Sequence, residues 1–419
     1  MNKRKFLKSL AFLGIGSGSI FSSKKVTAKT IAEIDPNAAD FWDQIRAAYK
    51  LKPDYINLEN GYYCFLPEET LDNYIKHLRD VNYQASSYMR TVQWDNKAKS
   101  AAMVAELVGA SPEEVVLTRN TTESIDLIIS GYPWKSGDEA IVSNQDYESL
   151  LNMFELAERR YDIKVKRIDI PMHPQDDAEI VDVYEKAITP KTKLMMVPHI
   201  VNITGHILPV RKIADMAHSH GVEIMLDGAH AVGHFDFNIS ELNCDYYGSS
   251  LHKWLSVPLG CGMLYVKKGK SAQIRPLLAP YELDQKTLLN LNHTGTHAVS
   301  TDLSVIDAVN FLNKMGSKRK DERLRYIQRY WSDQVRDLPG VNVNTPKDPN
   351  RSCAIANVGL DAMSPADMAK TLMEKYQIFT VAINGAGGVN GCRITPNVYT
   401  SESEMDKFVI ALKEMSGNA

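Results

Sequence analysis

Residues 249–255 read SSLHKWL and put a lysine, Lys253, directly after a strand-like run. That run, residues 244–248, reads CDYYG, and an apolar Trp-Leu pair and a Pro-Leu-Gly turn follow the lysine. A lysine that is buried at such a point has a lowered pKa and can form a Schiff base with an aldehyde. Lys253 is therefore a candidate for covalent chemistry with a carbonyl compound.

Strand-like and helix-like segments alternate on both sides of Lys253, from about residue 100 to 270. The expected strands are 115–118, 140–143, 163–170, 194–197, 223–226, 245–247 and 262–266. The expected helices between them are 123–129, 149–160, 178–187 and 210–220. This alternation predicts an α/β domain with a seven-stranded, mostly parallel sheet that is covered on both faces. Functional groups in such sheets lie beyond the carboxyl ends of the strands.

The pattern changes after about residue 300. A long helical region at 302–338 is followed by four short expected strands at 341–343, 354–358, 379–383 and 392–395. Two further helices are expected at 364–376 and 401–415. This pattern predicts a smaller C-terminal α+β domain. We expect the large domain at 71–300, the small domain at 301–419, and a segment at 29–70 that packs with the small domain.

Composition narrows the function classes. The chain has 419 residues, of which 44% are hydrophobic and 24% charged, so it can bury a sizeable core. Its net charge of −3 argues against a nucleic-acid binder that neutralises phosphates. The five cysteines are odd in number and scattered, which indicates neither a disulfide framework nor a zinc site. We therefore expect no metal.

The N-terminus has the composition of an export signal. Residues 2–8 read NKRKFLK, and the glycine-containing apolar run that follows is too short to span a bilayer. The head resembles the twin-arginine export motif, with Lys3 in place of the first arginine. We expect a signal peptide at 1–28, use of the twin-arginine machinery and a periplasmic protein. The alternatives are an amphipathic tail and a cytoplasmic location.

Polar side chains mark the ends of several expected strands. Thr121 and Thr122 stand where a strand turns into a helix, and helix N-termini hold anions. Asp227 ends an apolar strand, and Asn202 closes another. A helix cap for the threonines and a structural role for Asp227 remain open alternatives.

Together these groups predict one cofactor. A lysine for a Schiff base, a carboxylate for a pyridinium nitrogen, and hydroxyls at a helix N-terminus for a phosphate describe the requirements of pyridoxal 5′-phosphate. Each group is ambiguous alone, and their order in one chain makes them much less so.

The chain also resembles a known family. Its matching segments are INLENGYY at 56–63, DGAHAVG at 227–233, SSLHKWL with PLGCGMLYV up to 266, GTH at 295–297 and RITPNVYTSESEMDKF at 393–408. From about Tyr55 to the C-terminus it resembles the class V aminotransferases, in their isopenicillin N epimerase-like and selenocysteine lyase-like branch. The resemblance implies the pyridoxal-phosphate-dependent transferase fold of type I.

The resemblance also implies roles for residues around the cofactor. Lys253 would form the Schiff base, and Asp227 would pair with the pyridine nitrogen. The phosphate would be held by Thr121, Thr122, Ser250 and His252. Asn202 would bond the 3-oxygen, with His230 beside it as a further catalytic residue, and Tyr147 would stack on the ring. For His230 and Tyr147, plain core packing remains open.

Three further residues concern the substrate and a second subunit. Arg393 would bind the substrate carboxylate through its planar fork, unless it only forms a surface ion pair. Asn60 would line the mouth of the site. Thr296 would reach the phosphate of a neighbouring subunit, which implies a homodimer with shared sites.

The reaction is expected at the α- or β-carbon of an amino acid or a compound that contains one. Epimerase-like or lyase-like chemistry leads, and transamination or an oxidative or decarboxylating route remains open. Cys392 adjoins Arg393 on an expected strand, where neighbours point to opposite faces, so cysteine desulfurase chemistry is disfavoured. The glycine-rich residues 385–391 predict a flexible site edge. A non-catalytic protein of this fold and an envelope binding protein are the other classes.

Overall fold

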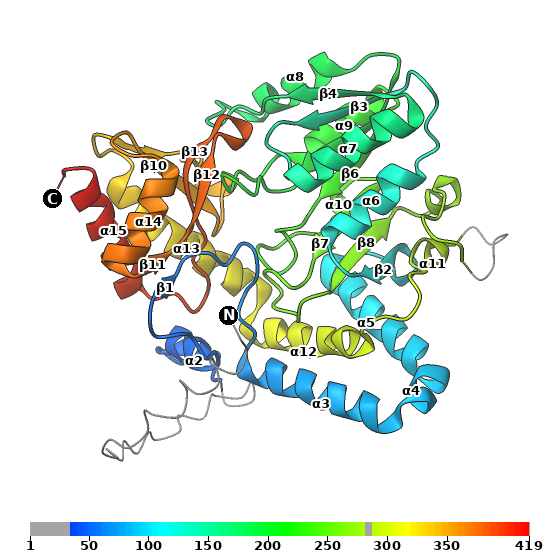
Figure 1. The fold of residues 1–419 in the computed structure, drawn as a ribbon, viewed down its shortest axis with the longest axis horizontal. Helices are drawn as coiled ribbons and strands as arrows, with labels where there is room; N and C mark the ends of the chain where they lie inside the picture. The colour runs from blue at the N-terminus through cyan, green and yellow to red at the C-terminus, as the bar shows by residue number, and fades with distance from the viewer. Residues whose placement is uncertain (1–33, 281–286, 419) are drawn as a thin grey trace, which may run out of the picture.

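The structure is a computed structural model that describes residues 34–280 and 287–418. A large sheet with its helices and a smaller C-terminal part lie side by side, and long helices run below the large sheet (Figure 1). The expected signal peptide at 1–28 lies outside the described residues. Within the described ranges, no helix has the length and apolar character that a membrane span requires.

The large part is built on a seven-stranded sheet. Its strands are β2 (Val115–Thr118), β3 (Glu139–Ser143), β4 (Lys164–Ile168), β5 (Thr192–Pro198), β6 (Glu223–Asp227), β7 (Tyr246–Ser250) and β8 (Gly262–Val266). They lie in the order β2-β8-β7-β6-β5-β3-β4, and β8 runs antiparallel to both of its neighbours. The other adjacent pairs are parallel. The predicted seven-stranded, mostly parallel sheet is confirmed.

Helices cover both faces of this sheet. One face carries α6 (Thr121–Gly131) and α7 (Glu148–Tyr161), and the other carries α5 (Gln93–Val108), α8 (Asp177–Ala187) and α9 (Val210–Ser219). Along β5, Leu194 and Met196 join the first core, while Met195 and Val197 join the second, as strand alternation requires. Each such buried side chain stabilises the fold by about 1.5–3 kcal/mol.

The connections contain shorter elements. They are α2 (Phe41–Ala47), α10 (Ile239–Leu242), α11 (Leu288–Leu291) and the 3-10 turns Pro112–Glu114, Ser271–Gln273, Pro349–Arg351 and Ala386–Gly388.

Two helical regions differ from the sequence expectation. Residues 71–100, to which no structure was assigned, belong to α3 (Glu68–Gln84), α4 (Ser86–Thr91) and the start of α5. The single helical region expected at 302–338 is two helices, α12 (Val299–Met315) and α13 (Ser317–Val335). They are separated at Gly316, whose φ of 87° only glycine adopts without strain. Helix α12 packs on α3 and α5, below the large sheet (Figure 1).

The small part has a four-stranded antiparallel sheet. Its strands are β9 (Val341–Val343), β10 (Ala356–Leu360), β12 (Val381–Asn384) and β13 (Asn390–Ile394), in the order β12-β13-β10-β9. Its core is shared with α13, α14 (Pro365–Tyr376) and α15 (Glu402–Met415). The strand expected at 379–383 is divided into β11 (Ile378–Phe379) and β12.

The N-terminal segment attaches to the small part through a two-stranded parallel sheet. Its strand β1 (Ile56–Asn57) pairs with β11, and Glu59 forms a further bridge to Thr395. The segment thereby comes to lie beside β13, which carries Arg393. The domain boundaries set at 70 and 300 stay predictions.

Candidate active site

The carboxyl ends of β6 and β7 bring the two central residues together. Asp227 is the last residue of β6, and Lys253 follows the end of β7 by three residues. Asp227 is buried and accepts a hydrogen bond from the N–H of Ala229 at 2.9 Å. Burial raises the pKa of Asp227, while this hydrogen bond and the charge of Lys253 oppose the rise. A buried carboxylate is thus held close to the amine of Lys253 at this edge.

The turn after β7 positions Lys253. Leu251 and Trp254 are fully buried, and the N–H groups of Leu251 and Val257 close the turn on carbonyls of the same segment. The Lys253 Nζ lies 3.0 Å from the Nε2 of His230. Burial lowers the pKa of Lys253 to about 8, although Asp227 acts in the opposite direction. An amine with this pKa is partly uncharged at neutral pH, as a nucleophile requires.

His230 follows Asp227 by three residues and is buried. Burial, aided by the charge of Lys253, lowers the pKa of His230 well below its ordinary value. Gly228 makes this turn possible, because a Cβ there would lie 2.1 Å from the ring of Tyr247. The imidazole is therefore a neutral group in contact with the lysine.

The start of α6 forms the second part of the site. The N–H of Thr121 donates to the Oγ of Ser250 at 3.0 Å, and their hydroxyl oxygens are 2.8 Å apart. Thr122 is the next residue of this helix, and Asn120 caps it through the N–H of Glu123. His252 lies beside Lys253 and donates from Nδ1 to the carbonyl of Cys261 at 3.2 Å. Hydroxyls gathered at a helix N-terminus suit a phosphate.

Two more predicted residues lie past the ends of neighbouring strands. Asn202 lies in the loop after β5, where its carbonyl accepts a hydrogen bond from the Nη1 of Arg393 at 3.3 Å. Tyr147 is the N-cap of α7, after β3, and 44% of it is exposed. The glycine-rich turn between β12 and β13 reaches the same region, since a Cβ on Gly387 would lie 2.5 Å from the side chain of Gln145.

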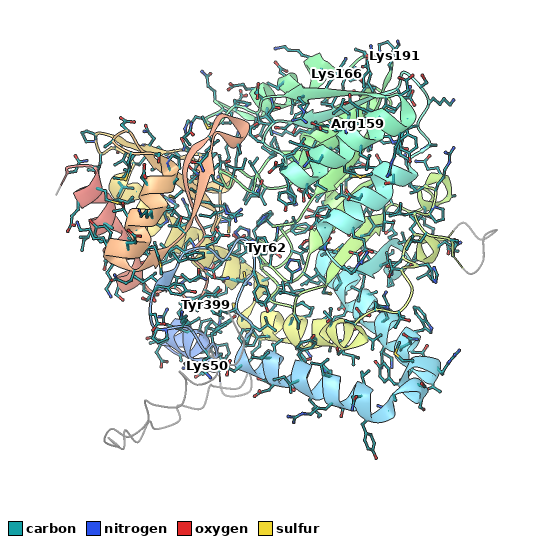
Figure 2. The ribbon with its side chains drawn as sticks, in the orientation of Figure 1. Lys50, Tyr62, Arg159, Lys166, Lys191 and Tyr399 are labelled. Carbon is teal, nitrogen blue, oxygen red and sulfur yellow. The ribbon has the colours of Figure 1, made fainter. Side chains whose placement is uncertain are left out.

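Arg393 lies on β13 of the small part and forms an ion pair with Glu59. Its Nε and Nη2 donate to the two carboxylate oxygens of Glu59, at 3.2 and 2.5 Å. Both side chains are nearly buried, with exposures of 10% and 7%. Glu59 is held in turn by the N–H of Tyr62, which lies at the junction of the two parts (Figure 2). The sequence prediction named Arg393 but missed Glu59, although Glu59 lies within the quoted segment 56–63.

Asn60, which the resemblance places at the mouth of the site, is buried in the structure. Its side chain is completely buried, its Nδ2 donates to the carbonyl of Thr395 at 2.7 Å, and its Oδ1 accepts from the hydroxyl of Tyr399 at 2.7 Å. The N–H of Asn60 also donates to the hydroxyl of Thr395 at 2.6 Å. Because these bonds occupy its donor and its acceptor inside the protein, Asn60 anchors the N-terminal segment to β13 instead of facing a substrate.

Thr296 lies apart from these residues. It is exposed in the connection between α11 and α12, next to a groove of about 850 Å³ that includes Trp94, Leu289 and His297. The predicted contact of Thr296 with a neighbouring phosphate involves a second subunit, so it stays a prediction.

The structure adds two residues that sequence reasoning missed. Trp254 donates from its indole nitrogen to the Nδ1 of His230 at 3.3 Å. His234 stacks on the ring of Trp254, with ring centroids 3.8 Å apart. Trp254 stands in the quoted motif SSLHKWL, and His234 directly follows the quoted motif DGAHAVG, but their contacts depend on how two separate turns meet.

Residues 64–408 match the family model described as aminotransferase class-V. The chain belongs to the class-V aminotransferase family. It is 26% identical to the isopenicillin N epimerase of Streptomyces clavuligerus over 394 residues, which are 90% of this chain and 98% of the relative. It is also 26% identical to a probable cysteine desulfurase of Halalkalibacterium halodurans, over 73% of this chain and 76% of the relative.

A solved structure shares the fold. A cysteine desulfurase of Escherichia coli superposes with a TM-score of 0.77 and 22% identity, covering 89% of this chain and 98% of the other. The type I fold predicted from the resemblance is confirmed.

The cofactor of this class-V protein is pyridoxal 5′-phosphate, and the residues present fit it. A buried carboxylate, an amine of lowered pKa and a helix start with two paired hydroxyls stand at one sheet edge. Close packing at this helix start depends on Gly262, where a Cβ would lie 2.7 Å from the Cα of Asn120. Lys253 would hold the cofactor covalently, Asp227 its ring nitrogen, and Thr121, Thr122 and Ser250 its phosphate.

Proposed function

We propose that this chain is an enzyme that removes and returns a proton at the α-carbon of an amino acid or a compound that contains one, with an epimerase-like or lyase-like outcome. The observation that carries the proposal is the contact between the Lys253 amine and the neutral His230, beside the buried Asp227. The high coverage of the epimerase relative supports the epimerase-like branch.

The roles of the chain's own groups follow from their chemistry. When bound, the cofactor supplies an electron sink for the carbanion formed at the α-carbon. Lys253, once released from the cofactor, takes the α-proton on Nζ, since its pKa of about 8 suits a general base near neutral pH. Asp227 would keep a proton on the ring nitrogen by its negative charge. Thr121, Thr122 and Ser250 would hold the phosphate, and Tyr147 would lie beside the ring.

A desulfurase reaction is the weaker alternative because of the cysteines. All five cysteines lie among the described residues and all are buried. Burial raises the pKa of Cys392 and of Cys64 to about 12 each. The Cys392 Sγ donates to the carbonyl of Pro365 in the small core, on the opposite strand face from Arg393. A thiol of this kind is a poor nucleophile.

The substrate carboxylate would bind at Arg393 next to Glu59. Three of the five N–H donors of Arg393 are engaged, two by Glu59 and one by the carbonyl of Asn202. A carboxylate that arrives there binds a guanidinium whose charge is already balanced. We therefore propose that the substrate carboxylate contributes less binding energy at the Arg393–Glu59 pair than it would at an unpaired arginine.

The proposal extends to the oligomeric state of the chain. Large apolar side chains are exposed on α3, in the groove near Thr296 and in the segment before residue 280: Leu71, Ile75, Leu78 and Tyr83, then Trp94 and Leu289, then Leu277 and Leu278. A second copy that covers these side chains would shield this apolar surface from water. We therefore propose a homodimer in which Thr296 reaches the phosphate of the neighbouring subunit. Light scattering that reports a monomer at micromolar concentration would contradict this.

The basic and apolar residues 2–20 support export through the twin-arginine pathway, which carries folded proteins. Export after folding would allow the cofactor to be inserted in the cytoplasm. Cell fractionation is expected to find processed protein in the periplasm. Unprocessed protein confined to the cytosol would contradict export.

Exchange of the α-proton tests the reaction. The cofactor-loaded chain is incubated in heavy water with a panel of L- and D-amino acids, and proton NMR follows the α-proton signal. We expect at least one compound to lose that signal, with the enantiomer or an eliminated fragment beside it. A keto acid would indicate transamination instead. No exchange with any amino acid or small peptide, in protein shown to hold the cofactor, would contradict the proposal.

A further inference from the structure

The hydrogen bond from Trp254 to His230 has a fixed direction. The indole nitrogen of Trp254 lies 3.3 Å from the Nδ1 of His230. An indole N–H only donates, so Nδ1 is the acceptor and carries no hydrogen. A neutral imidazole has one N–H, which must then be on Nε2.

That tautomer has a consequence at Lys253. The Nε2 of His230 lies 3.0 Å from the Nζ of Lys253. With its hydrogen on Nε2, His230 donates to Nζ, and only an uncharged amine has a lone pair to accept this hydrogen bond. Burial lowers the pKa of both groups, to about 8 for Lys253, so that the uncharged amine is within reach near neutral pH.

His234 holds Trp254 in this position. The two rings are stacked with a 12° angle between their planes. The Nε2 of His234 accepts from the N–H of Ala354 at 2.9 Å, so its Nδ1 donates to the carbonyl of His230 at 2.7 Å. Ala354 lies just before β10, so backbone of the small part fixes the ring that packs on Trp254.

A second contact fixes the backbone of Trp254. Lys320, a buried residue of α13, donates from Nζ to the carbonyl of Trp254. The indole itself is fully buried. Ring and backbone of Trp254 are thus held by residues from two other elements, as a precise donor requires.

We propose that Trp254 is a positioning residue that fixes His230 in its Nε2–H tautomer and thereby favours the uncharged form of Lys253, which takes up the cofactor. The role at Lys253 rests on the proposed function, whereas the tautomer does not. Without the indole N–H, Nε2 of His230 is free to accept from an ammonium group, which favours the charged lysine. The groups that face Lys253 are Asp227 from β6, Arg393 from β13, Glu59 and Cys64 from the N-terminal segment, and His230 and His252.

The tautomer is measured directly in the full chain without cofactor. Nitrogen-15 NMR of ring-labelled histidine distinguishes a protonated from an unprotonated ring nitrogen, and the His230→Gln variant identifies the His230 signals. We expect the Nε2–H form, unchanged between pH 5 and 8. The Nδ1–H form, or a ring that gains a proton in this range, would overturn the proposal.

Trp254→Phe keeps an aromatic ring and removes the donor. We expect mixed tautomers and a pKa of Lys253 that is higher by roughly one unit, which leaves about tenfold less free amine at pH 7. The readout is the rate at which the cofactor-free chain takes up pyridoxal 5′-phosphate, followed by absorbance from pH 6 to 10. The wild-type rate should level off above about pH 8, and the variant's at higher pH.

Trp331→Phe is the matched control. Trp331 is a fully buried tryptophan of the small core, and its indole nitrogen has no hydrogen-bond partner among the described atoms. We expect it to lose stability and to keep the wild-type tautomer and pH profile. Equal profiles for Trp254→Phe and wild type would overturn the positioning role. A shifted profile with no substrate exchange would instead leave this inference standing and contradict the proposed function.

Discussion

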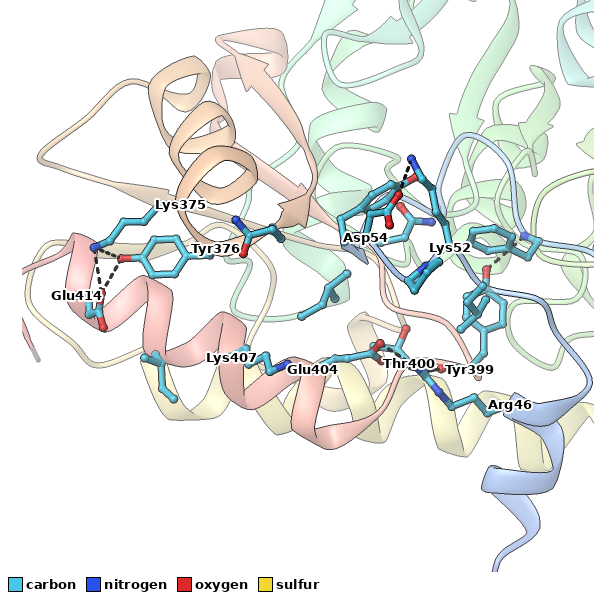
Figure 3. A pocket seen from close by; sticks show the side chains of 18 residues that line it. Arg46, Lys52, Asp54, Lys375, Tyr376, Tyr399, Thr400, Glu404, Lys407 and Glu414 are labelled. Carbon is cyan, nitrogen blue, oxygen red and sulfur yellow. Dashed lines mark hydrogen bonds and ion pairs between the residues drawn. The ribbon is translucent and has the colours of Figure 1, made fainter. Parts of the chain in front are cut away.

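Two lysine side chains in different parts of this molecule have pKa values that are shifted in opposite directions. At the sheet edge, Lys253 is half-buried against an imidazole, and burial lowers its pKa to about 8. In a groove of about 750 Å³ between the N-terminal segment and α15, Lys375 is exposed (Figure 3). Hydrogen bonds to the Tyr376 hydroxyl and to Glu414 raise the pKa of Lys375. In the groove, the side chain of Lys375 is therefore a charged ammonium group. At the edge of the large sheet, the side chain of Lys253 is an amine that can react.

Burial and the direction of hydrogen bonds mark the reactive site in this molecule, whereas the number of charges does not. Arg46 and Glu404 in the groove form a two-bond ion pair at 2.8 Å each, much like Arg393 and Glu59 at the edge. Only the second pair is nearly buried and shares its surroundings with Lys253. Matched substitutions in the two regions therefore distinguish an effect on the reaction from a general effect of removing a charged side chain.

The largest effect is expected from Lys253→Ala. Without the amine there is neither a covalent hold on the cofactor nor a base for the α-proton, so exchange should fall by at least about 1,000-fold. Proton NMR in heavy water measures it. Lys375→Ala should exchange at the wild-type rate. Comparable losses in both variants would contradict the contrast between the two lysines.

A smaller effect is expected from Asp227→Asn. The neutral amide cannot stabilise a protonated ring nitrogen, and a hydrogen bond to a charged group contributes about 1.5–3 kcal/mol, so cofactor affinity should fall by roughly 10- to 100-fold. Absorbance titration with pyridoxal 5′-phosphate measures it.

Asp245→Asn is the control for Asp227→Asn. Asp245 is also buried, but it lies before the amino end of β7, where it bonds His218 and the N–H of Ile224. This variant should lose stability and keep the affinity. An equal loss of cofactor affinity in both variants would contradict a specific role of Asp227 at the ring nitrogen.

The next effect concerns Glu59→Gln. The amide keeps an oxygen for the N–H of Tyr62 but no longer balances the charge of Arg393, so the site should bind a simple carboxylate such as propionate about tenfold more tightly. Calorimetry with propionate measures it, and Glu404→Gln in the groove is the control. Weaker binding by Glu59→Gln would mean that Glu59 mainly holds Arg393 in place.

The smallest effect is expected from Cys392→Ala. Because this thiol is buried in the small core with a raised pKa, the exchange rate per folded molecule should stay unchanged. The rate is measured by NMR after correction for folded protein by circular dichroism. A complete loss would revive the desulfurase alternative.

The large sheet could be predicted because its strands are short apolar runs, and parallel topology gathers their carboxyl ends at one edge. That rule places Asp227 and Lys253 near each other without any coordinates. It does not reach the Trp254–His230 bond, which depends on side-chain rotamers in two turns. Glu59 escaped notice because its partner is 334 residues away in the chain. The burial of Asn60 could not be predicted either, because a sequence motif does not tell which of its polar side chains point inward.

Borohydride reduction of the cofactor-loaded wild-type chain, with the modified peptide located by mass spectrometry, shows which amine reacts with the cofactor. The setting of Lys253 predicts one pyridoxyl group per chain, on Lys253. No stable adduct, or adducts spread over exposed lysines such as Lys375, would contradict the claim that the sheet edge holds the reactive amine.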